Sequence, residues 1–161
     1  MLDRLLGHDA DYARDIAAVE EHRHANLPAP DGKSIDYDQR DAMHYHVFDL
    51  EAWLEIALVT GCCGESMDRS FQFFERTLAE DPTHVEFANS TAAIDRKRAA
   101  AGFDYAKAHA FDVKRAARLV FAYATLPGRQ VDRGLWKAAT EGEKRDNLLY
   151  EARYYLWNTR H

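Results

Sequence analysis

One stretch of the chain is far more apolar than its neighbours. It begins with polar residues near Asp38 and becomes almost wholly apolar toward Thr60, with Trp53, Leu54 and Ile56 among its members. A helix that is apolar on most sides is a buried helix. Glycine commonly follows a helix end, and residue 61 is glycine. The pattern therefore predicts a buried helix from about residue 38 to residue 60, in the middle of the domain.

Amphipathic helices are predicted on both sides of this stretch. Residues 9–27 have helical spacing, with Arg23 at the edge of the apolar face, and Pro28 ends the segment. A third helix is predicted to begin with Ser66 as its N-cap and to end before Asp81. Its apolar stripe falls at i, i+4, i+7 and i+11: Met67, Phe71, Phe74 and Leu78.

The second half of the chain also has a helical pattern. Thr83 and Glu86 form a Thr-x-x-Glu capping box, which predicts a helix from His84 to Ala101. Further helices are predicted between Asp112 and Pro127, from Val131 to Thr140, and from about Glu143 to Asn158. No segment alternates convincingly enough to predict a strand. The sequence indicates a single all-α domain over residues 1–161, with about six or seven helices in antiparallel hairpins.

Composition and charge narrow the possible functions. The 161 residues carry a net charge of −6, which argues against whole-surface binding to nucleic acid. The N-terminus does not have the pattern of a secretory signal, and no stretch has the ~20 apolar residues of a membrane span. Cys62 and Cys63 are adjacent and form no CxxC motif, so no cysteine-based metal site is predicted, and localisation stays unknown.

Groups that can move protons gather where the buried helix begins. Arg40, His44, Tyr45 and His46 occupy one and a half turns, which is a pattern typical of a functional site. On a helix His44 and His46 point in nearly opposite directions, so they would not share a metal, and one of them packed in the core is the default. Tyr45 is either a proton donor or a buried tyrosine whose hydroxyl meets Asp49.

The segment Arg40-Asp-Ala-Met-His-Tyr-His-Val-Phe-Asp-Leu-Glu51 resembles the R-x-A-x-x-Y-H-x-Y-x-L stretch of the alginate lyase superfamily, the helical-toroid polysaccharide lyases. The segments at residues 83–90, 95–102 and 116–119 continue the resemblance. It implies β-elimination of a uronic-acid polymer without a cofactor. The resemblance implies that Tyr45 is the acid and could also be the base, that His46 tunes it or neutralises charge, and that Arg40 pairs with the uronate carboxylate.

Two departures from the family pattern limit this resemblance. The family tyrosine falls on Phe48, and Tyr45, three residues earlier on nearly the same face, would replace it. The family's Asn-His pair lies on earlier helices that this chain lacks. The chain therefore resembles the C-terminal portion of such a lyase, which would be a partial α/α toroid. Either another chain would supply the missing helices, or the chain would form a homo-oligomer.

Several further residues have both a functional and a structural interpretation. His44, Arg96 and Arg98 could bind an acidic polysaccharide, the two arginines through paired hydrogen bonds to carboxylates. The arginines could equally be cations that stabilise a helix C-terminus. The alternative function is a non-enzymatic helical binding protein, of the immunity or partner-subunit type. Its acidic surface would meet a basic partner, and the aromatic C-terminal helix would be its contact. An aromatic cluster could stack on sugar rings, or form core or a partner surface: Trp136, Tyr150, Tyr154, Tyr155 and Trp157.

Overall fold

The computed structural model describes residues 6–60, 64–104 and 107–142, and these residues fold mostly into helices. They form α2 (Asp9–Asn26), α3 (Ile35–Arg40), α4 (Met43–Thr60), α5 (Gly64–Glu80), α6 (Ala93–Ala100), the 3-10 helix η2 (Val113–Ala116), α7 (Ala117–Ala124) and α8 (Arg133–Thr140). The all-α class predicted from the sequence is confirmed.

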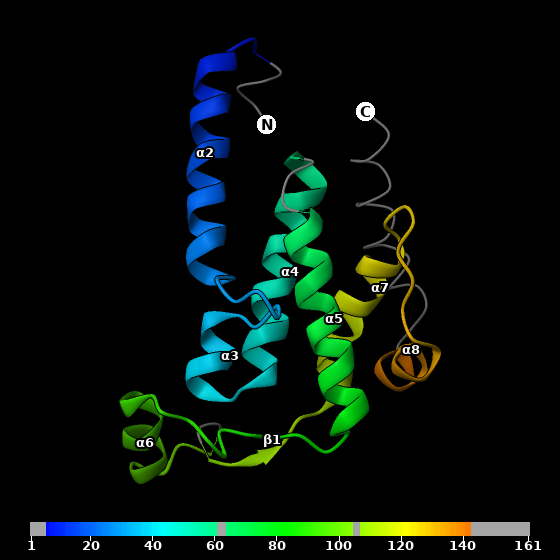
Figure 1. Ribbon diagram of the computed structural model, residues 1–161. Helices are drawn as coiled ribbons and strands as arrows, with labels where there is room; N and C mark the ends of the chain where they lie inside the picture. The colour runs from blue at the N-terminus through cyan, green and yellow to red at the C-terminus, as the bar shows by residue number, and fades with distance from the viewer. Residues whose placement is uncertain (1–5, 61–63, 105–106, 143–161) are drawn as a thin grey trace.

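The centre of the molecule is an antiparallel hairpin of α4 and α5 (Figure 1). The helices η2 and α7 pack against α4, and α8 packs against η2 and α7. The helices α2 and α3 also contact α4. The side chains at the middle of the core are fully buried: Leu50, Leu54, Phe71, Phe74 and Leu119. The apolar stretch and the stripe of the third predicted helix therefore do face the core. That these hairpins belong to a toroid stays a prediction.

The predicted helix over residues 38–60 is in fact two helices. α3 ends at Arg40, and Asp41 follows with a left-handed φ of 50°, so α4 begins only at Met43. Aspartate tolerates this conformation better than most residues. The carboxylate of Asp41 accepts hydrogen bonds from the backbone and side-chain nitrogens of Asn89, at 3.0 and 2.9 Å. A contact from a distant segment therefore stabilises a break that periodicity does not reveal.

The capping-box prediction at Thr83 is wrong. Val85–Glu86 is a short strand, β1, which pairs antiparallel with β2 (His109–Ala110), and α6 starts only at Ala93. The prediction that the chain has no strand is therefore also wrong. The carboxylate of Glu86 turns away from its own segment and bonds to the first turn of α4. The tertiary contact overrides the local capping pattern, and it places β1 beside the start of α4.

Other predicted boundaries are confirmed. α2 ends at Asn26, before Pro28, and the Asp112 side chain caps η2 by accepting from the backbone N–H of Lys114 at 3.1 Å. Ser66, in contrast, lies inside α5, and its hydroxyl is 2.5 Å from the buried Arg23 guanidinium. Its predicted role as an N-cap is wrong, because α5 begins two residues earlier.

The loop between α2 and α3 lies directly on α5. Gly32 has a φ of 94°, and a Cβ at this position would collide with the backbone carbonyl of Arg69. Only glycine allows this approach, which brings the loop, including Ser34, close to the buried side of α4.

Some predictions fall outside the described residues. These are the adjacent Cys62 and Cys63, the helix at residues 143–158, and its four aromatic residues. Trp136 is described: it is half-buried on α8 and its ring lies 5.7 Å from that of Phe121, so it joins the core. None of the described helices combines the length and the apolar character needed to cross a bilayer.

Candidate functional site

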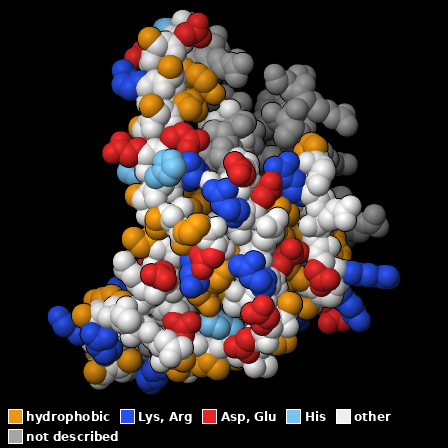
Figure 2. Space-filling view, viewed as in Figure 1, with side chains coloured by type: hydrophobic (Ala, Val, Ile, Leu, Met, Phe, Trp, Pro, Cys, Tyr) orange, Lys and Arg blue, Asp and Glu red, His pale blue; other side chains and the backbone are white. Residues whose placement is uncertain are grey.

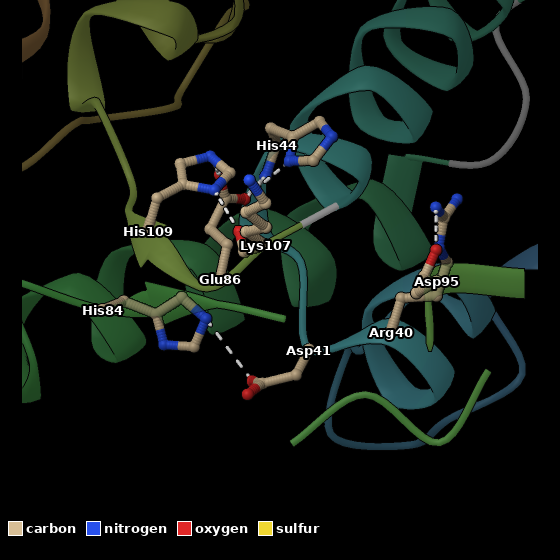
Figure 3. A network of polar contacts seen from close by, with 8 residues as sticks. All are labelled: Arg40, Asp41, His44, His84, Glu86, Asp95, Lys107 and His109. Carbon is tan, nitrogen blue, oxygen red and sulfur yellow. Dashed lines mark hydrogen bonds and ion pairs between the residues drawn. The ribbon is translucent and has the colours of Figure 1, made fainter. Parts of the chain in front are cut away.

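A buried carboxylate organises the start of α4. Glu86 is 0% exposed, and its Oε1 accepts hydrogen bonds from the backbone N–H of His44 at 2.6 Å and from His44 Nδ1 at 2.7 Å (Figure 3). A negative group at a helix N-terminus is favoured by the helix dipole. Because an ionised carboxylate can only accept, the proton of neutral His44 must lie on Nδ1. Nε2 of His44 is then a free base.

A second histidine faces the other oxygen of the same carboxylate. His109, on β2, places Nε2 3.2 Å from Glu86 Oε2, while its Nδ1 lies 2.7 Å from the carbonyl oxygen of Lys107 (Figure 3). Burial alone would raise the pKa of Glu86. The side-chain and backbone hydrogen bonds from His44, with smaller electrostatic contributions from His44 and His109, outweigh this and hold the pKa below its ordinary value. Glu86 is therefore ionised at neutral pH. We call His44, Glu86 and His109 the carboxylate–histidine cluster.

Arg40 is committed to partners inside the protein. Its Nε and a terminal nitrogen bind the two oxygens of Asp95 at 3.0 and 2.6 Å, and Asp95 is 2% exposed. The guanidinium carbon also lies 3.8 Å from the ring centroid of Tyr45. Asp95 already occupies the paired donors of this guanidinium, which argues against the predicted role of Arg40 as the group that pairs with a substrate carboxylate. Arg40 instead stacks on the ring of Tyr45 and helps to hold it in place.

Tyr45 stands next to the free base. Its ring centroid is 4.0 Å from that of His44, and its ring is half-buried. The alternative contact with Asp49 does not form: Oδ2 of Asp49 is buried without a hydrogen-bond partner. Tyr45 and His44 therefore present a proton donor and a proton acceptor side by side.

Phe87 packs against the residues of the site and has a strained backbone conformation. Its φ of 62° is rare for a bulky residue, and such strain tends to occur at functional sites. The ring is buried, with centroids 5.5 Å from His44, 6.2 Å from Tyr45 and 5.9 Å from His109. The strained residue therefore fills the space between three side chains that could carry chemistry.

A cavity of about 270 Å³ opens above this arrangement. It is lined by His44, Tyr45, Val47, Phe48, Glu51 and Arg115, and we call it the α4 cavity. Arg115, at the end of η2, is exposed, and no hydrogen bond or ion pair of its guanidinium is found among the described residues. The cavity therefore brings together a base, an acid and an uncommitted cation.

His46 lies on the sealed side of α4 and cannot contact a ligand. It is 0% exposed; its Nε2 donates to the carbonyl of Ser70 at 3.1 Å, and its Nδ1 accepts from the backbone N–H of Ser34 at 3.3 Å. Burial lowers its pKa to about 4. These surroundings argue against the predicted catalytic role of His46, because desolvation keeps the ring neutral and both nitrogens already bond to backbone groups.

The remaining predicted ligands lie on α6. Figure 2 shows Lys and Arg side chains gathered on this helix. Arg96 is exposed and donates to the carbonyl of Thr91 at 3.1 Å, whereas Arg98 is half-buried and its charge helps to lower the pKa of Asp95. Neither arginine lines the α4 cavity. The structure therefore separates them from the acid and the base.

Sequence reasoning missed three residues of the site: Glu86, His109 and Arg115. Glu86 was interpreted as a local helix cap, and His109 carries no motif. Arg115 belongs to no motif either, and stands out only as one of several Lys and Arg residues in the second half of the chain. Within the described ranges, no group of three or more His, Cys, Asp or Glu residues could hold a metal ion.

Comparisons with known proteins give no relative. No protein-family model, no curated protein and no solved structure matches this chain.

Proposed function

We propose that this protein is a helical lyase that cleaves a uronic-acid polymer by β-elimination in the α4 cavity. The observation that carries the proposal is the orientation of His44: buried Glu86 binds its Nδ1–H at 2.7 Å, so that Nε2 is left as the base beside Tyr45. A base that a third group orients is the recurring arrangement of acid–base catalysis.

Each step of a β-elimination has a residue in this arrangement. Arg115 would pair with the uronate carboxylate and so make the proton on C5 more acidic. His44 would remove that proton; the electron pair forms the C4=C5 double bond while the C4–O bond breaks. Tyr45 would protonate the departing oxygen. Arg40, 3.8 Å from the Tyr45 ring, would offset the charge that the phenolate acquires.

A larger cavity than the α4 cavity is less suited to this chemistry. It has about 670 Å³, lies between α5 and α8, and is lined mostly by apolar side chains. Two of its carboxylates already accept backbone hydrogen bonds: Glu75 from Asp132 at 2.8 Å, and Asp132 from Leu135 at 2.9 Å. It favours the alternative function, a non-enzymatic binding protein with an apolar contact.

One assay tests the proposal. The purified protein is incubated with polymannuronate, polyguluronate and glucuronan, and the ultraviolet absorbance of the unsaturated product is followed. We expect cleavage of at least one polymer and its loss in Tyr45→Phe, at an unchanged melting temperature. Tyr12→Phe, on α2, is the matched control and should keep full activity. No absorbance change with any polymer at high protein concentration would contradict the proposal and favour the binding protein.

A further inference from the structure

The most exposed large apolar side chain among the described residues stands at the α4 cavity. Phe48 is 68% exposed, although its neighbours Val47 and Leu50 are 3% and 0% exposed. Single exposed apolar residues are common and need no explanation by themselves. Phe48 differs because it is also part of the cavity wall.

Helix geometry fixes Phe48 next to the reactive groups. It follows His44 by four residues and Tyr45 by three, and residues at these spacings share one face of a helix. Arg115, from η2, contributes to the same cavity. A ligand whose carboxylate meets Arg115 would therefore have the Phe48 ring within the same small space.

The size of the cavity limits what can occupy it. About 270 Å³ is below the range of cavities that enclose a drug-sized ligand, which begins near ~300 Å³. One sugar ring fits such a space, while the rest of a polymer lies outside. A pyranose carries C–H groups on its faces, and covering these with an aromatic ring removes apolar surface of both partners from water.

We propose that Phe48 is a sugar-stacking residue, which makes the α4 cavity selective for uronate rings over other polyanions. This inference rests on the proposed function, since it assigns the substrate class of the same cavity. Charge recognition by Arg115 alone would accept any carboxylate polymer. Stacking on Phe48 requires a ring with an apolar face next to the carboxylate, which a flexible polyanion such as polyglutamate does not have.

The test compares Phe48→Ala with Phe103→Ala. Phe103 is 52% exposed and lies outside the α4 cavity, so it is a matched control for loss of an exposed phenylalanine. Neither side chain is part of the buried core, and alanine favours a helix, so Phe48→Ala should fold normally. We expect KM for the cleaved polymer to rise roughly tenfold in Phe48→Ala with kcat within about twofold, and Phe103→Ala to match the wild type. Phe48→Trp should retain the wild-type KM.

A binding experiment separates the inference from the proposed function. Uronate oligosaccharides and polyglutamate are titrated into wild-type protein while the aromatic proton signals are followed by NMR. Shifts of the Phe48 ring signals with the sugar but not with polyglutamate would support the inference, even if no polymer is cleaved. The absence of cleavage would contradict only the lyase proposal. An unchanged KM in Phe48→Ala, or equal shifts with polyglutamate, would overturn the inference and leave the lyase proposal intact.

Discussion

His44 and His46 stand two residues apart on α4 and have opposite surroundings. His44 faces the α4 cavity, with its Nδ1 bonded to the buried carboxylate of Glu86. His46 faces the inside of the protein, where its two nitrogens bond to backbone groups of Ser34 and Ser70. The first arrangement leaves one nitrogen available to a ligand. The second uses both nitrogens, and burial suppresses protonation of the ring.

The difference shows how one helix can serve chemistry on one face and packing on the other. Two residues of a helix span just over half a turn, so the two rings point to opposite sides of α4, and the sequence alone does not show which of them faces the core. What distinguishes them is the partner supplied by another segment: a strand residue for His44, and a loop and α5 for His46. A substitution on one side of α4 should therefore have little effect on the other side.

The largest effect is expected from paired substitutions of the two histidines. His44→Gln should reduce the rate of polymer cleavage about 100- to 10,000-fold, the usual contribution of a general base, with little change in stability. His46→Ala should instead lower the free energy of unfolding by roughly 2–4 kcal/mol, because it leaves a cavity and two unpaired backbone groups. Initial rates and urea unfolding measure both. Equal losses of stability in the two variants would break the distinction.

The next effect concerns the carboxylate that orients His44. Glu86→Gln retains the size of the side chain but removes its charge and its selectivity for the Nδ1–H tautomer. We expect a roughly 10- to 100-fold fall in kcat, typical of groups that orient a reactive histidine, and a stability loss of about 1–2 kcal/mol because the start of α4 loses its anion. Retained kcat would show that Glu86 acts only as a helix cap.

The stability contributed by His46, on the buried side of α4, should depend on pH. The pKa of His46 is about 4 in the folded protein and near 6.5 when exposed, so the unfolded state binds more protons between these values. Stability from this group is therefore present above pH 6.5 and lost as the pH falls toward 4, by up to about 3 kcal/mol. Urea unfolding at pH 7 and pH 4.5 measures the loss. In His46→Ala, the contribution of this group to the acid sensitivity should be absent.

The smallest effect is expected one turn further along α4, at Asp49. Burial, together with the charge of Asp36, raises the pKa of Asp49 to about 6, although a hydrogen bond from Ser34 opposes the shift. The folded state then binds more protons than the unfolded state between about pH 4 and pH 6, so stability falls as the pH rises through this window. Asp49→Asn should gain on the order of 1 kcal/mol at pH 7.5, after allowance for solvent screening, and nothing at pH 4. A gain of equal size at both pH values would contradict this cause.

Local patterns predicted the fold well where packing follows periodicity. The stripe from Met67 to Phe74 and the end of α2 before Pro28 needed only helix geometry and proline chemistry. The break at Asp41 and the strand at Glu86 could not be predicted in this way, because both depend on distant partners. These are Asn89 for Asp41, and the strand β2 for Glu86.

The sequence indicates the place of the candidate site better than the contacts of its side chains. The sequence drew attention to the start of the buried helix, and Tyr45 and His44 do line the α4 cavity there. The contacts of Arg40 with Asp95 and of His46 with Ser70, which argue against the predicted roles of Arg40 and His46, are not visible in the sequence. No local pattern reveals which buried groups a side chain meets.

The tautomers of the two histidines test the central claim most directly. Long-range ¹H–¹⁵N correlation spectra of the wild-type protein, recorded from pH 8 to pH 5, distinguish a proton on Nδ1 from one on Nε2. At pH 8 the account predicts the proton of His44 on Nδ1, facing Glu86, and that of His46 on Nε2, facing Ser70, with His46 still neutral at pH 5. A proton on Nε2 of His44, or a His46 that gains charge above pH 6, would contradict it.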